Sequence, residues 1–232
     1  MHPRAFATAI LAVTVAAGTS ASAGLIDWQS AVSIGTPAGY TNLNITSPIT
    51  ANIGAYNETT NGGISYEFIV NATNAGVSSA LMGKIAPLFT QEWSALKWEQ
   101  FQDTGRYGVT NYQLKDYDSG IPNTPGVDTH VVFVNNSVDT LLYVNGFLAA
   151  TIVGASPTIS GEVGIGGARL NRSVFIDPLQ GAIVGVAVYD AALSPAEIAE
   201  HARAYAVPEP GGLSLAVLAA LSGLRFATCR GH

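Results

Sequence analysis

The amino-acid sequence predicts an all-β sandwich, and three observations support this fold class. Short runs of β-prone residues follow one another closely through the second half of the chain, separated by Gly, Asn and Pro. Gly, Thr, Asn, Ser and Val are abundant, and this composition favours strands and turns. No long helices alternate with the runs, so a sandwich or barrel is expected rather than an α/β fold.

The strand pattern is clearest in two places. The stretch ISYEFIVN (64–71) alternates in period two, which predicts a strand with one buried face. Two β-rich runs flank Asn145-Gly146, a pair that tolerates positive φ, so a type I′ hairpin is expected there. Further strands are predicted in THVVFV (129–134), GEVGIGGARL (161–170) and GAIVGVAVYD (181–190).

One helix is predicted after these strands, in LSPAEIAEHARAY (193–205). Ser194 is a suitable N-cap, Pro195 occupies the first helical position, and Glu197 completes a capping box. An apolar stripe on this helix is expected to pack on the sandwich, and it is formed by Ile198, Ala202 and Tyr205.

Composition limits the partners and the chemistry of the domain. The net charge is −6 and only 11% of the residues are charged, with no basic stripe, so nucleic acid is excluded as an expected partner. The only cysteine is Cys229, close to the C-terminus, so the domain is expected to have no disulfide and no thiol chemistry.

The N-terminal residues have the features of a secretory signal peptide. Arg4 precedes an apolar stretch from Ala5 to Ala17, and Ala21-Ser22-Ala23 supplies the small residues of a cleavage site before Gly24. The alternative is an N-terminal membrane anchor. We therefore expect a leader at residues 1–23, one domain at 24–206 and a separate C-terminal segment at 207–232.

The C-terminal segment combines Pro208-Glu209-Pro210, an apolar run at 213–224, and the basic residues Arg225 and Arg230. The run is shorter than the ~20 residues that a membrane-spanning helix needs. The segment resembles the PEP-CTERM sorting signal, which implies recognition by an exosortase, a membrane protease-transpeptidase, and delivery to the cell surface or exopolysaccharide matrix. The alternative is an ordinary tail anchor with its basic residues on the cytoplasmic side.

From Trp93 to Tyr205, the order of motifs resembles the laminin G-like, concanavalin A-like jelly-roll domains of exported bacterial proteins. The Thr-His strand, the YVNG hairpin and the VGIGG strand precede a final strand and helix. The residues of that last part that match the family are Gly181, Ile183, Val186, Tyr189, Ala192, Leu193, Ser194, Glu197 and Ile198. Many relatives carry Asp-Glu where this chain has Val184-Gly185, so polar groups are missing from the last strand.

Two sets of residues are candidates for a binding site. The resemblance implies that Ca²⁺ is a possible ligand, and Asp116 and Asp118 in KDYDSG offer paired oxygen ligands; the alternative is two solvated loop carboxylates. Exposed aromatic side chains can stack on sugar rings, whereas buried ones belong to the core. The aromatic candidates for ligand binding are Trp93, Trp98, Tyr112 and Tyr117.

The sequence carries no recognisable catalytic motif. Glycosidases need two carboxylates at a set separation, and no Glu-x-Asp-x-Glu string or Gly-x-Ser-x-Gly elbow is present. His130 is expected to pack or hydrogen-bond locally. The expected function is that of an exported, non-enzymatic surface or matrix protein that binds carbohydrate, with transient membrane attachment through its C-terminus. The alternatives are a structural or adhesive module, with a protein partner or none, and a polysaccharide-active hydrolase.

Overall fold

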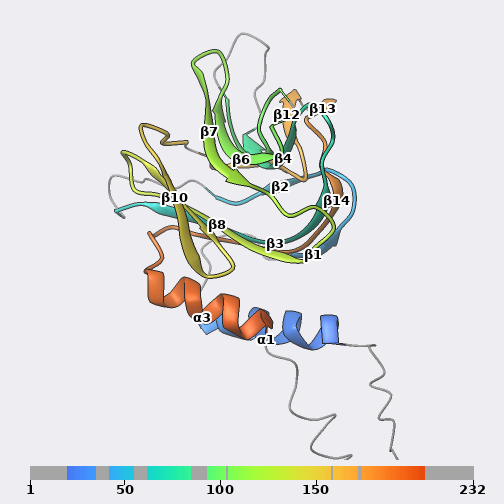
Figure 1. The fold of residues 1–232 in the computed structure, drawn as a ribbon, viewed down its shortest axis with the longest axis vertical. Helices are drawn as coiled ribbons and strands as arrows, with labels where there is room; N and C mark the ends of the chain where they lie inside the picture. The colour runs from blue at the N-terminus through green and yellow to red at the C-terminus, as the bar shows by residue number, and fades with distance from the viewer. Residues whose placement is uncertain are drawn as a thin grey trace, which may run out of the picture. The chain divides into compact units, whose positions relative to one another are not determined.

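Two six-stranded antiparallel sheets face each other in the structure, a computed structural model (Figure 1). It describes residues 20–34, 42–54, 62–84, 93–102, 104–157, 159–171 and 174–206. The compact unit spans Gly24–Val207. The predicted sorting residues, from Pro208 to Arg230, lie outside the described residues, as does most of the predicted leader. The all-β sandwich predicted from the sequence is confirmed.

The strands of each sheet come from distant parts of the chain. In order across it, the first sheet consists of β1 (Asn42–Ile45), β14 (Gln180–Tyr189), β3 (Ile64–Thr73), β8 (Thr129–Asn135), β9 (Thr140–Val144) and β10 (Phe147–Ile152). The second sheet consists of β2 (Ile49–Asn52), β11 (Glu162–Ile165), β4 (Ser79–Lys84), β5 (Ser94–Glu99), β6 (Arg106–Asn111) and β7 (Lys115–Pro122). A small two-stranded sheet is formed by β12 (Ala168–Asn171) and β13 (Val174–Ile176).

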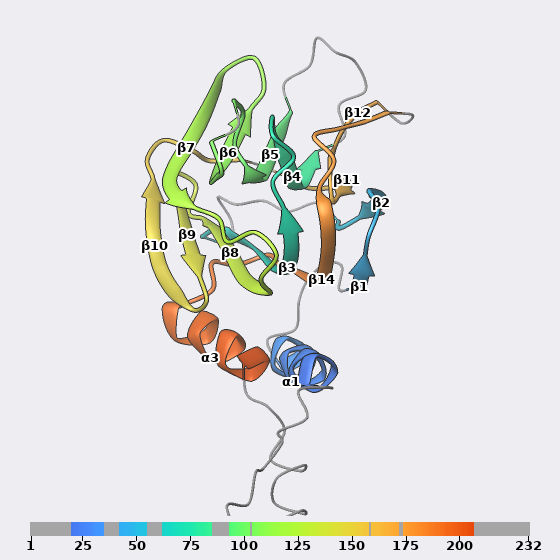
Figure 2. The same ribbon diagram turned by 45° about the vertical axis from the view of Figure 1, so that its right-hand side comes forward.

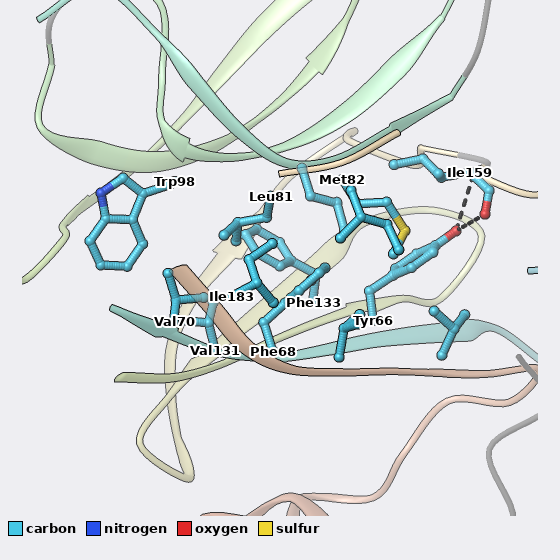
Figure 3. Close-up of a cluster of buried hydrophobic side chains, with 14 of the residues drawn as sticks. Tyr66, Phe68, Val70, Leu81, Met82, Trp98, Val131, Phe133, Ile159 and Ile183 are labelled. Atoms are coloured by element: carbon cyan, nitrogen blue, oxygen red, sulfur yellow. Dashed lines mark hydrogen bonds between the residues drawn. The ribbon is translucent and has the colours of Figure 1, made fainter. Parts of the chain in front are cut away.

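The main hydrophobic core fills the space between the two large sheets. Figure 3 shows Leu81 and Met82 of the second sheet pointing toward Phe68 of the first. Tyr66 keeps its hydroxyl satisfied there, because it donates to the backbone oxygen of Ile159 (2.9 Å) and accepts from the Ile159 N–H (3.0 Å). Full burial of each large apolar side chain contributes roughly 1.5–3 kcal/mol, so this interface supplies most of the stability of a domain without disulfides.

The β9–β10 hairpin has the predicted turn. Asn145 and Gly146 both have positive φ values, 51° and 85°, as a type I′ turn requires. A Cβ atom on Gly146 would lie 3.0 Å from the Cβ of Ala202, so the hairpin tip packs closely on a helix. β10 is an edge strand that exposes Phe147 and Leu148, and its pairing with β9 is interrupted by a bulge.

The predicted helix is confirmed as α3 (Pro195–Ala206). Both hydrogen bonds of the capping box are present: the Ser194 N–H donates to Glu197 Oε2 (2.7 Å), and the Glu197 N–H donates to Ser194 Oγ (3.3 Å). Ile198 is buried as expected. His201, which the apolar stripe did not include, is buried with it, so the docked face of α3 carries an ionisable group.

A second helix, α1 (Ser20–Ile34), was not predicted. Leu25, Trp28 and Val32 are buried in one cluster with residues of the first sheet and α3. Gly185 makes this docking possible, because a Cβ atom there would lie 2.6 Å from Cζ3 of Trp28. The departure from the family pattern at Val184-Gly185 therefore provides space for the indole of α1.

Both helices cover the face of the first sheet that is turned away from the second sheet (Figure 1 and Figure 2). As a result, β3 is buried on both faces along most of its length. The prediction that this strand has one buried face was wrong, because alternation identifies the two faces of a strand and gives no information on what packs against each.

Glu67 lies at the centre of this helix-to-sheet interface and is fully buried. Its carboxylate accepts hydrogen bonds from Trp28 Nε1 on α1 (3.2 Å) and from the Tyr189 hydroxyl on β14 (2.9 Å). It also contacts His130 Nε2 on β8 (2.6 Å) and His201 Nδ1 on α3 (3.0 Å). One side chain thus joins five elements, and we call these five residues the Glu67 network.

The Glu67 network is charged. Burial acts to raise the pKa of Glu67, but the hydrogen bonds and charges of His130 and His201 outweigh it and lower the pKa from 4.5 to about 2. Burial acts to lower the pKa of His201, but Glu67, with Glu197 and Glu200, raises it above its ordinary 6.5. Glu67 is therefore a carboxylate, and His201 holds its proton more tightly than a free histidine does.

We predict that Glu67→Gln destabilises the domain by about 3 kcal/mol, because it leaves buried donors without their ionised acceptor. The contribution of Glu67 is complete above its unfolded pKa of 4.5 and is lost as the pH falls toward 2. The contribution of His201 is complete below 6.5 and is lost as the pH rises through its folded pKa. The loss of stability in the variant should therefore be greatest between pH 4.5 and 6.5.

Urea unfolding of both proteins, followed by tryptophan fluorescence across this range and on either side of it, measures the difference in unfolding free energy. Asp190→Asn is the control, because Asp190 is an exposed carboxylate directly after β14 and is not among the groups that shift the pKa of Glu67 or His201. If Glu67→Gln lowers the unfolding free energy only slightly, or by the same amount at all pH values, the network is not charged.

Candidate functional site

A pocket lies on the face of the second sheet that is turned away from the main core. Along β5, Leu96 and Trp98 point into the core between the sheets, so Lys97 projects from the opposite face. The cavity there has a volume of about 220 Å³. We call it the outer pocket, and its lining residues are Ser78, Trp93, Lys97, Phe101, Thr110, Tyr112, Asp116, Ile176 and Asp177.

Aromatic side chains form the walls of the outer pocket. Trp93 and Tyr112 stack with their ring centroids 4.9 Å apart and their planes 19° from parallel. Trp93 is almost completely buried, whereas Tyr112 is half-buried and Phe101 is 50% exposed. Trp93 Nε1 has no hydrogen-bond partner within the part of the chain that the structure describes. Tyr112 and Phe101 are therefore the rings that a ligand can reach.

A buried lysine and an aspartate lie between these walls. The side chain of Lys97 is 2% exposed; its ammonium donates to Ser78 Oγ (2.8 Å) and forms an ion pair with Asp177. Burial lowers the pKa of Lys97, although Asp177 and Asp116 act to raise it. Asp177 has a φ of 50°, in the left-handed region, and its backbone oxygen accepts the Ala80 N–H (2.9 Å). The Asp177 carboxylate is thus held by its own backbone geometry and by Lys97.

The other side of the pocket is fixed by a network across three strands. The Thr110 hydroxyl donates to Asp116 Oδ1 (2.6 Å), which fixes that carboxylate on β7. Gln100 Nε2 donates to the backbone oxygens of Val109 (2.9 Å) and Tyr117 (3.0 Å). Gly108 leaves space for this amide, since a Cβ atom there would lie 2.5 Å from Gln100 Nε2. The polar edge of the pocket is therefore set before a ligand arrives.

The structure brings three of the predicted site residues together, because Trp93, Tyr112 and Asp116 all line the outer pocket. Trp98 does not join them: it is fully buried in the main core, edge-on to Tyr107 with ring centroids 5.4 Å apart. Tyr117 packs against the main core, and the ammonium of Lys115 lies 4.6 Å from its ring centroid. Neither Trp98 nor Tyr117 belongs to the outer pocket.

The predicted calcium pair is also divided. Asp118 accepts hydrogen bonds from Arg106 (3.1 Å) and from the Gly120 N–H (2.7 Å), while Asp116 is bonded to Thr110. Calcium takes six to eight oxygen ligands. Among the described residues, no group of three or more His, Cys, Asp or Glu side chains is placed to hold a metal ion. Asp116 and Asp118 each have partners within the protein, and calcium binding at this pair stays a prediction.

Sequence reasoning missed Lys97 and Asp177. Lys97 carries a weak signal, because a charged residue at the centre of the strand SALKWE is unusual unless it has a partner. The partner lies 80 residues away and just before Pro178, and nothing in the local pattern links the two. His201, which completes the Glu67 network, was missed for the same reason.

A larger hollow, of about 440 Å³, lies between α3 and the β9–β10 hairpin. Small and apolar residues form much of its lining, including Gly146, Ala199 and Ala202. The Nε2 atom of His130, also in the lining, is bonded to Glu67.

The lining of this hollow also includes Phe147, Arg203 and Tyr205, and the Tyr205 hydroxyl donates to Asp128 (2.6 Å). The outer pocket has two stacked rings beside a buried polar cluster, and we take it as the candidate binding site on that ground.

We predict that the buried ion pair of the outer pocket is strongly coupled. Asp177→Ala should cost about 3 kcal/mol, because it leaves the buried ammonium of Lys97 without its carboxylate. Lys97→Met should lower the unfolding free energy by less, since Asp177 is the more exposed partner. The double variant should lower it by less than the sum of the two single variants.

Urea unfolding of the two single variants and the double variant measures this coupling. The exposed pair Arg106–Asp118 is the matched control, for which the same cycle should give less than about 1 kcal/mol. Additive costs for Lys97 and Asp177 would contradict the prediction.

In the described residues, no helix has the length and apolar character needed to cross a membrane.

Comparisons with known proteins agree with the fold. No curated protein matches the chain. The carbohydrate-binding module CBM40 of Ruminococcus gnavus IT-sialidase, solved with α2,3-sialyllactose, has 17% identity and a TM-score of 0.51, and the match covers 69% of this chain and 96% of that one. Domain 4 of AbnA, a GH43 extracellular arabinanase from Geobacillus stearothermophilus solved with arabinotriose, has 17% identity and a TM-score of 0.51. That match covers 67% of this chain and 72% of that one.

NanB sialidase from Streptococcus pneumoniae is similar over a smaller share of its length, with 16% identity, a TM-score of 0.52, and coverage of 70% of this chain and 28% of that one. At these identities the structures show a shared fold alone. The family described as the Concanavalin A-like lectin/glucanases superfamily matches residues 39–199, more than half of the chain. The chain therefore belongs to the Concanavalin A-like lectin/glucanases superfamily.

Proposed function

We propose that the domain is a carbohydrate-binding module and that it holds its sugar in the outer pocket. The observation that carries this proposal is the placement of Tyr112 and Phe101 beside the polar groups of Lys97 and Asp116. Aromatic rings stack on the apolar faces of sugar rings, and the polar groups can bond to the hydroxyls. The similar structures solved with sialyllactose and arabinotriose support the same class of ligand.

The size of the outer pocket favours a small part of a glycan. Its volume of about 220 Å³ is below the roughly 300–1,000 Å³ of sites for drug-sized ligands. One sugar ring, at a chain end or within a polysaccharide, fits this space better than a long segment does. An extracellular polysaccharide, which repeats such rings, is the partner that we propose.

We also propose that the domain does not hydrolyse its ligand. Glycosidases use one carboxylic acid with a raised pKa together with a second carboxylate. In the outer pocket, Asp177 is paired with Lys97 and Asp116 accepts a hydrogen bond from Thr110, so each carboxylate already has a partner. This arrangement supports binding better than proton donation to a glycosidic oxygen.

We predict that Tyr112→Ala and Asp116→Ala each weaken glycan binding at least tenfold, because each removes a group that the sugar contacts. A glycan array on residues 24–206, followed by calorimetry on the best ligand, tests this. Phe147→Ala, an exposed aromatic residue outside the pocket, should leave the affinity unchanged.

Absence of binding to every glycan would favour the structural or adhesive alternative. Release of reducing ends from the bound glycan, abolished by Asp116→Asn or Asp177→Asn, would favour the hydrolase. Each of these outcomes contradicts a different part of the proposal.

We further propose that the protein is exported and sorted by its C-terminal segment. In support, the compact unit spans Gly24–Val207, which leaves the expected sorting segment outside it. Cleavage before Gly24 would remove the first four residues of α1, Ser20–Ala23. We predict that intact-mass analysis of the protein from the native cell envelope finds a species that begins at Gly24 and lacks Cys229 and His232. A mature species that still carries Cys229 would show a permanent tail anchor instead.

A further inference from the structure

We infer that the outer pocket takes uncharged sugars and excludes sugar acids such as uronic and sialic acids. The inference rests on the proposed function, because it concerns the ligand of the same pocket. Two observations carry it: the net charge of the lining residues, and the contacts that the ammonium of Lys97 already makes with Asp177 and Ser78.

The lining of the outer pocket has more negative than positive charge. Its residues include one cation, Lys97, and two carboxylates, Asp116 and Asp177. Lys97 and Asp177 form an ion pair and balance each other. The charge of Asp116 is left over, and its neighbour Thr110 provides a hydrogen bond but no charge. A carboxylate on a bound sugar would therefore approach an uncompensated carboxylate.

Lys97 is poorly placed to serve as a receptor for an anion. Its side chain is only 2% exposed, and its ammonium already contacts both Asp177 and Ser78. A ligand carboxylate that reached the remaining N–H of Lys97 would lie beside the carboxylate of Asp177 and be repelled by it. Asp177 is held in place there, because its backbone oxygen accepts the N–H of Ala80 on β4.

Among the residues whose side chains the structure describes, two cations on the neighbouring strands are also engaged. Arg106 on β6 is paired with Asp118, two residues after Asp116 on β7. Lys115 precedes Asp116, but its ammonium lies over the ring of Tyr117. The π faces of Tyr112 and Phe101 carry partial negative charge and add no attraction for an anion.

The same groups suit the hydroxyls of an uncharged sugar. An ammonium has three N–H donors, and Lys97 uses donors on Ser78 and Asp177, which leaves one for a hydroxyl oxygen. The Asp116 oxygen that does not accept from Thr110 can accept from a hydroxyl. A hydroxyl both donates and accepts, so it can satisfy both groups, whereas a carboxylate only accepts.

Matched pairs of sugars test the inference. Methyl glucoside and methyl glucuronide, and the corresponding galactose pair, differ only in the oxidation of C6. NMR titration of residues 24–206 should give dissociation constants that are at least tenfold larger for the uronides than for the neutral glycosides. In Asp116→Asn, the ratio of the two dissociation constants should be at least threefold smaller than in the unchanged protein. The control Glu200→Gln removes a charge of the same sign from the exposed face of α3, outside the pocket, and should leave the ratio of the two dissociation constants unchanged.

The outcomes separate this inference from the proposed function. A uronide that binds as well as or better than its neutral partner, or an Asp116→Asn variant with the same ratio of dissociation constants, would overturn the charge selection while leaving carbohydrate binding intact. Failure of both members of every pair to bind, together with an empty glycan array, would overturn the proposed function and this inference with it.

Discussion

The buried carboxylate of Glu67 is the contact on which the helical side of the domain depends. Four donors from four other elements converge on it, and two of them lie on the helices α1 and α3. Apolar packing is tolerant of sliding, whereas hydrogen bonds to a buried charge specify one arrangement. Glu67 thus fixes the position of α1 and α3 on the first sheet, and Trp28 can reach it only because β14 has glycine at position 185.

The two sheets consequently have different outer faces. That of the first sheet is covered by two helices, so its charged group is buried and fully engaged. Among the described residues, that of the second sheet is covered where β12 and β13 pack on Ala80 and Ala95. Beside this cover, Lys97 and Asp177 line a hollow. The same sandwich thus uses buried charge for cohesion on one side and, as we propose, for a binding site on the other.

Local signals in the sequence were sufficient for the β9–β10 turn and the α3 cap, because each depends on residues within three positions of one another. Alternation identified the strands, and it placed Trp98 on the opposite face of β5 from Lys97. It could not show which face meets the other sheet, so Trp98 remained a candidate for binding. Glu67 and His201 are 134 residues apart, and their pairing depends on helix docking that no local pattern records. Helix α1 was hidden because its first turn, Ser20–Ala23, lies within the stretch that is typical of a leader.

The bulge in the β9–β10 pairing has a consequence for copies of this protein held close together. An edge strand with unpaired backbone groups and apolar side chains such as Phe147 and Leu148 is a template on which a second chain can add its own strand. The extra residue between Leu148 and Ala150 bends the strand and shifts its donors and acceptors out of regular spacing. Neighbouring copies therefore meet an edge that cannot be extended in register, and a crowded layer of these domains can remain a layer of separate molecules.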